Sequence, residues 1–238
     1  MATRASCHEI QGQARSAPMP SPPRDLGPGL HHVWVNATGN ERYYLDNDDR
    51  IMWVRLLTNV LDRLGWKCVA FCQLSTHVHS LLSVPDTSLP VGMKRLNMAY
   101  SKDFNTRHDR VGQFVRRRYG SRRIVDGRDL VGTYAYVVLN PVLAGLCPRP
   151  EDWRWSSYGT TLRISSDFPF VDAALAIAEA GGSTEALRRT VDARVRDRLS
   201  LRATAGVGHL DVSRGAGQSL SSSFAMRIST LPERMRVS

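Results

Sequence analysis

The pattern of hydrophobic and polar residues predicts a regular order of short elements in the first half of the chain. Apolar residues recur with strand or helix spacing in five segments, namely a strand at 31–36, a helix at 51–61, a hairpin at 66–82, a helix at 89–107 and a basic strand at 112–125. The order strand, helix, strand, strand, helix, strand is typical of an α+β fold, a ferredoxin-like (RRM-like) antiparallel sheet with helices packed on one face.

The second half of the chain predicts helices and less regular segments. A third helix is expected from Gly127 to Leu139, with Pro141 ending it, and weaker helical stretches at 171–180 and 184–201. Trp153 and Trp155 are expected to fold back onto the domain. The expected organisation is a disordered leader at 1–29, a domain at 30–162, a helical extension at 163–201 and a mobile basic tail at 202–238.

The hairpin holds the strongest candidate site. Its second strand opens with His77-Val78-His79. On a strand, residues i and i+2 project from the same face about 6.5–7 Å apart, so both imidazoles can bind one divalent cation while Val78 points into the core. The alternative is a histidine pair on a half-exposed strand face with no ligand. A triple-histidine strand would need a third histidine at Leu81, and structural zinc usually has three or four Cys or His ligands.

The third helix supplies the other half of the candidate site. Tyr136 and Asn140 are one turn apart and share a face, whereas Tyr134 lies about 200° away from Tyr136. If that face lies over the histidines, the Asn140 amide oxygen can join His77 and His79 around a metal. The Tyr136 hydroxyl then points at whatever the metal polarises. The alternative is a tyrosine packed on the sheet.

Charge indicates a polyanionic partner. The chain has 32 Lys and Arg against 22 Asp and Glu, a net charge of +10. Residues 94–128 hold eleven Lys and Arg against three Asp, a net charge of +8. A field focused in this way suits nucleic acid, although an arginine-rich solvated surface would look the same.

Membranes and disulfides are not expected. The sequence has no run of 18 apolar residues and no recognisable signal peptide. Cys68 and Cys72 would lie about 13 Å apart on one strand, too far for a disulfide, and are expected to be small core residues of a cytoplasmic protein.

The ordered set of motifs resembles the single-tyrosine HUH transposases, and most strongly their REP-associated tyrosine transposase (RAYT) branch. The likeness is carried by His77-Val78-His79, the basic strand and the run from Tyr136 to Leu146 (YVVLNPVLAGL), with His31-His32-Val33 and Trp155-Ser156-Ser157-Tyr158 matching as well. It spans about residues 30–162. Thr76 stands where the family usually has Asn.

The resemblance implies a metal-dependent DNA endonuclease and strand-transferase that acts on single-stranded or hairpin DNA with Mg²⁺ or Mn²⁺. Tyr136 would attack the scissile phosphate and form a 5′-phosphotyrosine. His77 and His79 would bind the metal, and Asn140 stands at the position of a third ligand. Arg118 matches a strand arginine expected near DNA phosphate, and weaker candidates for backbone contacts are Lys94, Arg95, Arg116 and Arg117.

Other readings stay open at this point. A catalytically inactive relative would keep only binding to hairpin DNA or RNA. An RNA-binding protein of similar sheet topology is a third class, disfavoured because the sheet lacks paired aromatics for stacking bases. A monomer and a homodimer are both compatible with the sequence, and Tyr136 can serve its own metal site or that of a partner.

Overall fold

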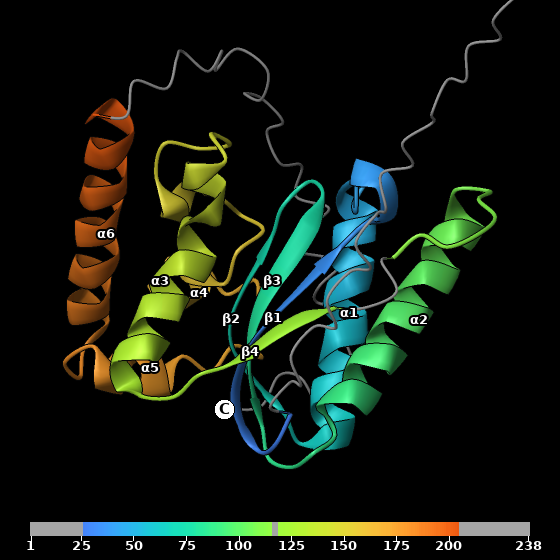
Figure 1. The fold of residues 1–238 in the computed structure, drawn as a ribbon, viewed down its shortest axis with the longest axis horizontal. Helices are drawn as coiled ribbons and strands as arrows, with labels where there is room; N and C mark the ends of the chain where they lie inside the picture. Colours follow the sequence, from blue (N-terminus) through green and yellow to red (C-terminus); the bar gives the residue numbers. More distant parts are fainter. Residues whose placement is uncertain (1–25, 116–118, 205–238) are drawn as a thin grey trace, which may run out of the picture.

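The computed structural model describes residues 26–115 and 119–204, and it has the expected α+β architecture (Figure 1). Its ferredoxin-like unit consists of β1 (Gly29–Asn36), α1 (Asn47–Leu64), β2 (Lys67–Gln73), β3 (His77–Val84), α2 (Leu89–Arg107) and β4 (Gly120–Arg123). The four strands form one antiparallel sheet in the order β2-β3-β1-β4. The predicted fold class is therefore confirmed. Most of the expected leader and most of the expected tail lie outside the described residues.

Local sequence signals explain where the first helix begins and ends. The Asp46 side chain accepts a hydrogen bond from the Asp49 backbone N–H, and the Asp49 carboxylate accepts one from the Asp46 backbone N–H, which together form a capping box. Gly65 ends α1 in the left-handed conformation at φ 64°, where a residue without Cβ is favoured. Helix α1 is thereby placed to pack its apolar side on the sheet.

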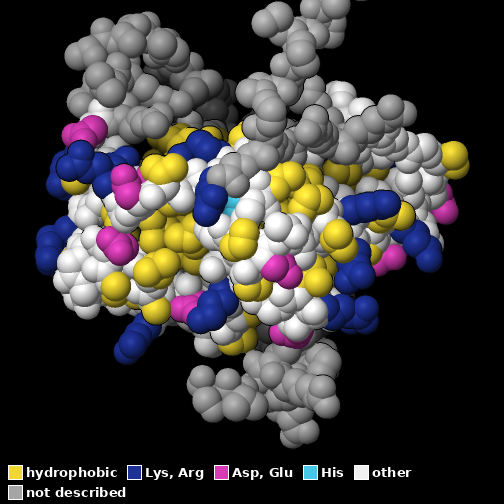
Figure 2. Space-filling view, turned by 60° about the horizontal axis from the view of Figure 1, so that its bottom comes forward, with side chains coloured by type: hydrophobic (Ala, Val, Ile, Leu, Met, Phe, Trp, Pro, Cys, Tyr) yellow, Lys and Arg dark blue, Asp and Glu magenta, His cyan; other side chains and the backbone are white. Residues whose placement is uncertain are grey.

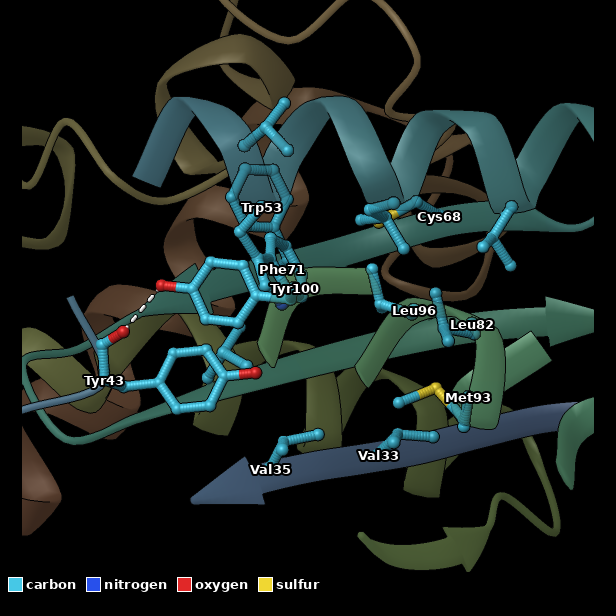
Figure 3. Packing of buried hydrophobic residues seen from close by; sticks show 14 of the residues in the cluster. Val33, Val35, Tyr43, Trp53, Cys68, Phe71, Leu82, Met93, Leu96 and Tyr100 are labelled. Atoms are coloured by element: carbon cyan, nitrogen blue, oxygen red, sulfur yellow. Dashed lines mark hydrogen bonds between the residues drawn. The ribbon is translucent and has the colours of Figure 1, made fainter. Parts of the chain in front are cut away.

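Helices α1 and α2 cover one face of the sheet. Their core includes the aromatic stack of Tyr43 on Tyr100, and the Tyr100 hydroxyl donates to the Tyr43 carbonyl oxygen at 2.6 Å (Figure 3). Val33, Val35 and other strand residues with the same orientation point into this core. In α2, Leu96, Tyr100 and Phe104 are buried, whereas Val91 is exposed.

A second layer lies on the opposite face of the sheet. Helix α3 (Gly127–Leu143) packs over β2 and β3, and it is flanked by α5 (Ala174–Glu179) and α6 (Thr184–Thr204) (Figure 1). Helices α5 and α6 lie in the part of the chain expected to be a helical extension, and with α3 they form a second apolar core. The short elements η1 (Thr38–Asn40), η2 (Pro150–Asp152) and α4 (Tyr158–Thr161) connect the larger ones.

Two sequence-based boundaries were wrong. The helix α3 continues through Pro141 to Leu143, because a proline in the last turn removes only its own N–H, while Ala144 still donates to the Asn140 carbonyl at 2.9 Å. The basic strand is shorter than 112–125, since β4 comprises only Gly120–Arg123 in the described part of the chain, with an isolated bridge between Ala37 and Val115.

The segment that contains Trp153 and Trp155 folds back onto the domain, as expected, and covers the edge of β2. Gln73 donates from its backbone N–H to the Trp155 carbonyl at 2.8 Å, and Ser157 donates to the Phe71 carbonyl at 3.0 Å. Trp155 is buried. This pairing satisfies backbone groups that an open sheet edge would expose.

Candidate functional site

The strand β3 presents both histidines on the sheet face that α3 covers. Their ring centroids lie 5.0 Å apart. Val78 between them is buried in the core under α1 and α2. The alternation predicted from the sequence therefore holds, and His77 and His79 form a pair on one face of the sheet.

Helix α3 brings Tyr136 to this pair. The Tyr136 ring centroid lies 5.4 Å from that of His79, and the two rings meet edge to face. The Tyr136 side chain is 36% exposed, whereas Tyr134 is fully buried. Burial also raises the pKa of the Tyr134 phenol well above its usual value. Of these two tyrosines, only Tyr136 is available to a substrate.

A third histidine, which the sequence did not single out as a site residue, completes the cluster. His32 on β1 has its Nε2 atom 3.0 Å from Nδ1 of His79, and the two rings stack at 5.1 Å. The His32 ring also contacts Tyr136 edge to face at 5.6 Å. The register of β1 on β3 explains its position, because Trp34 lies opposite His79 and Asn36 opposite His77. Alternation on β1 then places residues 32, 34 and 36 on one face.

These side chains surround an open cavity of about 760 Å³. The sheet contributes histidines and Trp34, β4 contributes Arg122, α3 contributes a stripe that includes Tyr136, and α6 contributes Arg194. The full lining is His32, Trp34, Asn36, His77, His79, Arg122, Arg128, Asp129, Gly132, Thr133, Tyr136 and Arg194.

The histidines are held in their neutral form. Burial lowers the pKa of His79 to about 3, and repulsion from the protonated forms of His32 and His77 adds to this effect. Burial and the Arg122 guanidinium lower the pKa of His32 to about 4, although Asp129 opposes the shift. Burial also lowers the pKa of His77. At neutral pH all three rings are therefore uncharged, and a neutral imidazole is the form that binds a metal.

Each histidine of the β3 pair has one ring nitrogen engaged. Nδ1 of His77 lies 2.9 Å from the Thr76 hydroxyl, so the threonine at the usual asparagine position still contacts this ring. Nδ1 of His79 is engaged by His32. Within the residues that the structure describes, no hydrogen bond is made by Nε2 of either ring. Both rings therefore keep a free nitrogen.

This donor set fits a divalent cation held by two imidazoles. In the described ranges there is no group of three or more His, Cys, Asp or Glu that could hold a metal. A closed four-ligand zinc site is thus not formed by these residues. Mg²⁺ and similar ions keep several waters and take further oxygens from substrate phosphates, which the open cavity permits.

Asn140 is not brought to the cavity lining. Its amide Nδ2 donates to the Tyr136 carbonyl at 2.8 Å, within the same helix, and the residue is buried. The spacing of one turn that predicted a shared face also accounts for this contact. A role of Asn140 as ligand stays a prediction.

The predicted DNA-contacting residues divide into two groups. Lys94 and Arg95 are exposed on α2, on the sheet face away from the cavity. Arg116, Arg117 and Arg118 lie outside the described residues. The structure instead brings Arg122 to the cavity, where Asp129 holds it through two hydrogen bonds of 2.7 and 2.8 Å, and Arg122 also donates to the Thr133 hydroxyl at 2.6 Å.

The fold and the cavity define a ferredoxin-like α+β domain with a histidine cluster and one accessible tyrosine on the same sheet face. Residues 29–129 match the family model described as "Transposase IS200 like". The resemblance to this transposase family is therefore confirmed for that part of the chain. The match ends before Tyr136, and no curated protein matches the sequence.

One solved structure supports the fold, and two others are much weaker matches. A REP-associated tyrosine transposase bound to a REP hairpin aligns with a TM-score of 0.55 and 16% identity over 61% of this chain and 86% of that one. A protein from Deinococcus radiodurans R1 that has been assigned as a transposase has a TM-score of 0.35, with 18% identity over 49% and 95% of the two chains. The tRNA(His) guanylyltransferase of Saccharomyces cerevisiae has a TM-score of 0.38, with 6% identity over 73% and 80%. The latter two likenesses are too weak to bear on the fold.

No helix in the described residues is both long enough and apolar enough to cross a membrane.

Proposed function

We propose that this protein is a metal-dependent DNA endonuclease and strand-transferase, a transposase that cleaves single-stranded or hairpin DNA through a 5′-phosphotyrosine intermediate. The observation that carries the proposal is the position of Tyr136. Its exposed phenol lies beside His79 in an open cavity, with the two ring centroids 5.4 Å apart. A nucleophile and a metal-binding pair are thus close enough to act on one phosphate.

The metal would be held by His77 and His79, with Asn140 as a candidate third ligand after a change of rotamer. When bound, Mg²⁺ or Mn²⁺ acts as a Lewis acid on a phosphate oxygen and assists loss of the phenol proton. The neutral state of the histidines favours an anionic substrate, because the cation keeps its full double charge. His32 would fix the orientation of His79 through their shared hydrogen bond.

The covalent step replaces one phosphodiester bond with another, so the energy of the broken bond is retained. The Tyr136 oxygen forms a bond to phosphorus while the bond from phosphorus to the 3′-oxygen breaks. The phenol gives up its proton and the departing 3′-oxygen gains one, so the products are a 5′-phosphotyrosine and a free 3′-hydroxyl. A tyrosine nucleophile is useful for strand transfer because the adduct can be attacked later by another 3′-hydroxyl, whereas simple hydrolysis would not need it.

Three features support hairpin DNA as the substrate. The chain carries a net charge of +10. Its residues 29–129 match a transposase family. The structural neighbour of the same fold was solved bound to a REP hairpin. Arg118 remains the first candidate for a phosphate contact, followed by Arg116, Arg117, Lys94 and Arg95.

The test is adduct formation on a hairpin oligonucleotide with single-stranded flanks, incubated with Mn²⁺ and resolved on a denaturing gel. A label at the 3′ end stays with the protein adduct, whereas a label at the 5′ end marks the released fragment. Tyr136→Phe should keep hairpin binding and abolish the adduct. Tyr134→Phe is the matched control, and it should retain the adduct because Tyr134 is fully buried.

Two results would overturn the proposal. An adduct that persists in Tyr136→Phe would place the nucleophile elsewhere. Tight hairpin binding by the unaltered protein without any adduct, across several flank sequences, would instead identify a catalytically inactive relative that only binds hairpin DNA or RNA.

A further inference from the structure

The last described helix takes part in the cavity. Helix α6 lies beyond residues 29–129, the range matched by the family model. Leu187 and Val191 on α6 are fully buried in the same apolar core as α3. Arg194 lies three residues after Val191 and lines the cavity. The packing of α6 on α3 therefore gives the Tyr136 cavity a wall that the transposase family match does not include.

The helix α3 meets Arg194 with a glycine. A Cβ atom added at Gly132 would lie 3.2 Å from Nη2 of Arg194, so the guanidinium lies directly over the glycine. Gly132 is one turn before Tyr136, and Arg128 is one turn before Gly132. The three positions form a stripe on one face of α3, about 6 Å apart along the axis, and all three line the cavity.

Among the described residues, no acidic side chain pairs with Arg128 or Arg194. Asp129 is the only acidic residue of the described cavity lining, and it is engaged by Arg122 through two hydrogen bonds. Neither Arg128 nor Arg194 forms an ion pair or hydrogen bond with another residue of the described ranges. Two exposed guanidinium groups that have no acidic partner in the described ranges, beside a phenol, form a site for an anion.

We propose that Arg128 and Arg194 form a phosphate subsite that holds the DNA backbone next to the phosphate attacked by Tyr136. The inference rests on the proposed function, and it identifies α6 as part of the substrate-binding surface. On the face seen in Figure 2, Lys and Arg side chains are scattered among apolar ones, so their distribution on that face does not mark a single DNA-binding surface. The stripe from Arg128 to Tyr136 gives the strand a direction along α3.

The test measures binding of a fluorescent hairpin oligonucleotide with a single-stranded flank in the Tyr136→Phe background, so that cleavage does not interfere. Arg194→Ala should weaken binding roughly five- to tenfold. It should also make the negative slope of log affinity against log salt shallower by about 0.7, the value for one lost single-strand phosphate contact. Arg196→Ala is the matched control. Arg196 is exposed on the same helix, about 200° away, and does not line the cavity.

Further measurements separate the subsite from a structural effect and from the proposed function. Arg194→Lys keeps the charge, and it should retain the salt slope while binding more weakly than arginine. Shortening the single-stranded flank of the oligonucleotide should weaken binding by the protein that retains Arg194 more than binding by Arg194→Ala. Equal slopes for Arg194→Ala and Arg196→Ala would overturn the subsite even if the Tyr136 adduct forms. A slope of log affinity against log salt that is reduced only in Arg194→Ala would support the subsite even if the protein with Tyr136 forms no adduct.

Discussion

His32 and His79 are joined across neighbouring strands by a hydrogen bond of 3.0 Å between Nε2 of His32 and Nδ1 of His79. If Nε2 of His79 is to bind a metal, its proton must lie on Nδ1, which then donates to His32. In that arrangement His32 accepts the hydrogen bond and fixes both the tautomer and the ring orientation of His79. His32 is thus a positioning residue for the proposed metal site.

Replacing His32 should therefore weaken metal binding. His32→Ala is expected to reduce the affinity for Mn²⁺ about 10- to 100-fold, the usual cost of losing a partner of a ligating histidine. Calorimetric titration of Mn²⁺ into the protein without DNA measures the effect. His32→Gln should restore part of the affinity, because the amide oxygen can accept the same hydrogen bond. An unchanged affinity in His32→Ala would remove this role.

His77 should matter for the metal and little for the fold. Its side chain is only partly buried and, unlike Val78, does not belong to the core under α1 and α2. His77→Ala is expected to change the free energy of unfolding by less than about 1 kcal/mol in the absence of metal. Mn²⁺ at 100 times its dissociation constant should stabilise the unaltered protein by about 2.7 kcal/mol and should not stabilise His77→Ala.

Thermal unfolding with Mn²⁺ and with EDTA distinguishes the two roles of His77. The same samples should lose adduct formation in EDTA. A large fall in melting temperature for metal-free His77→Ala would favour a core histidine over a metal ligand.

Local patterns were enough to predict the hairpin and the separation of Tyr136 from Tyr134 on α3, since strand alternation places His77 with His79 and helix periodicity puts the two tyrosines on different faces. They could not reveal His32, because its position depends on the register of β1 on β3, which joins residues far apart in the chain. Arg194 is a similar case. It reaches the cavity only because Leu187 and Val191 dock α6 on α3.

The arrangement of Tyr136 and His79 within one chain predicts catalysis in cis. Their rings already lie 5.4 Å apart, so no partner subunit is needed to bring them together. Mixing His77→Ala with Tyr136→Phe should therefore give no adduct on the hairpin oligonucleotide, although both variants bind it. If adduct returns, and mass analysis finds it on the His77→Ala chain, the tyrosine acts on the metal site of a partner.

The positions of Lys94 and Arg95 separate binding from cleavage. Both are exposed on α2, on the sheet face opposite the cavity, so they can contact the backbone of a long substrate without touching the scissile phosphate. The double variant Lys94→Ala/Arg95→Ala should make the negative slope of log affinity against log salt shallower by up to about 1.4, as expected for two single-strand phosphate contacts. The fraction of bound hairpin converted to adduct should not change.

Binding at several salt concentrations tests the change in slope, and single-turnover adduct formation at saturating protein tests the unchanged conversion. An unchanged slope would remove α2 from the DNA surface, and slower conversion at saturation would connect α2 to the cavity in a way that its position on the opposite face does not explain.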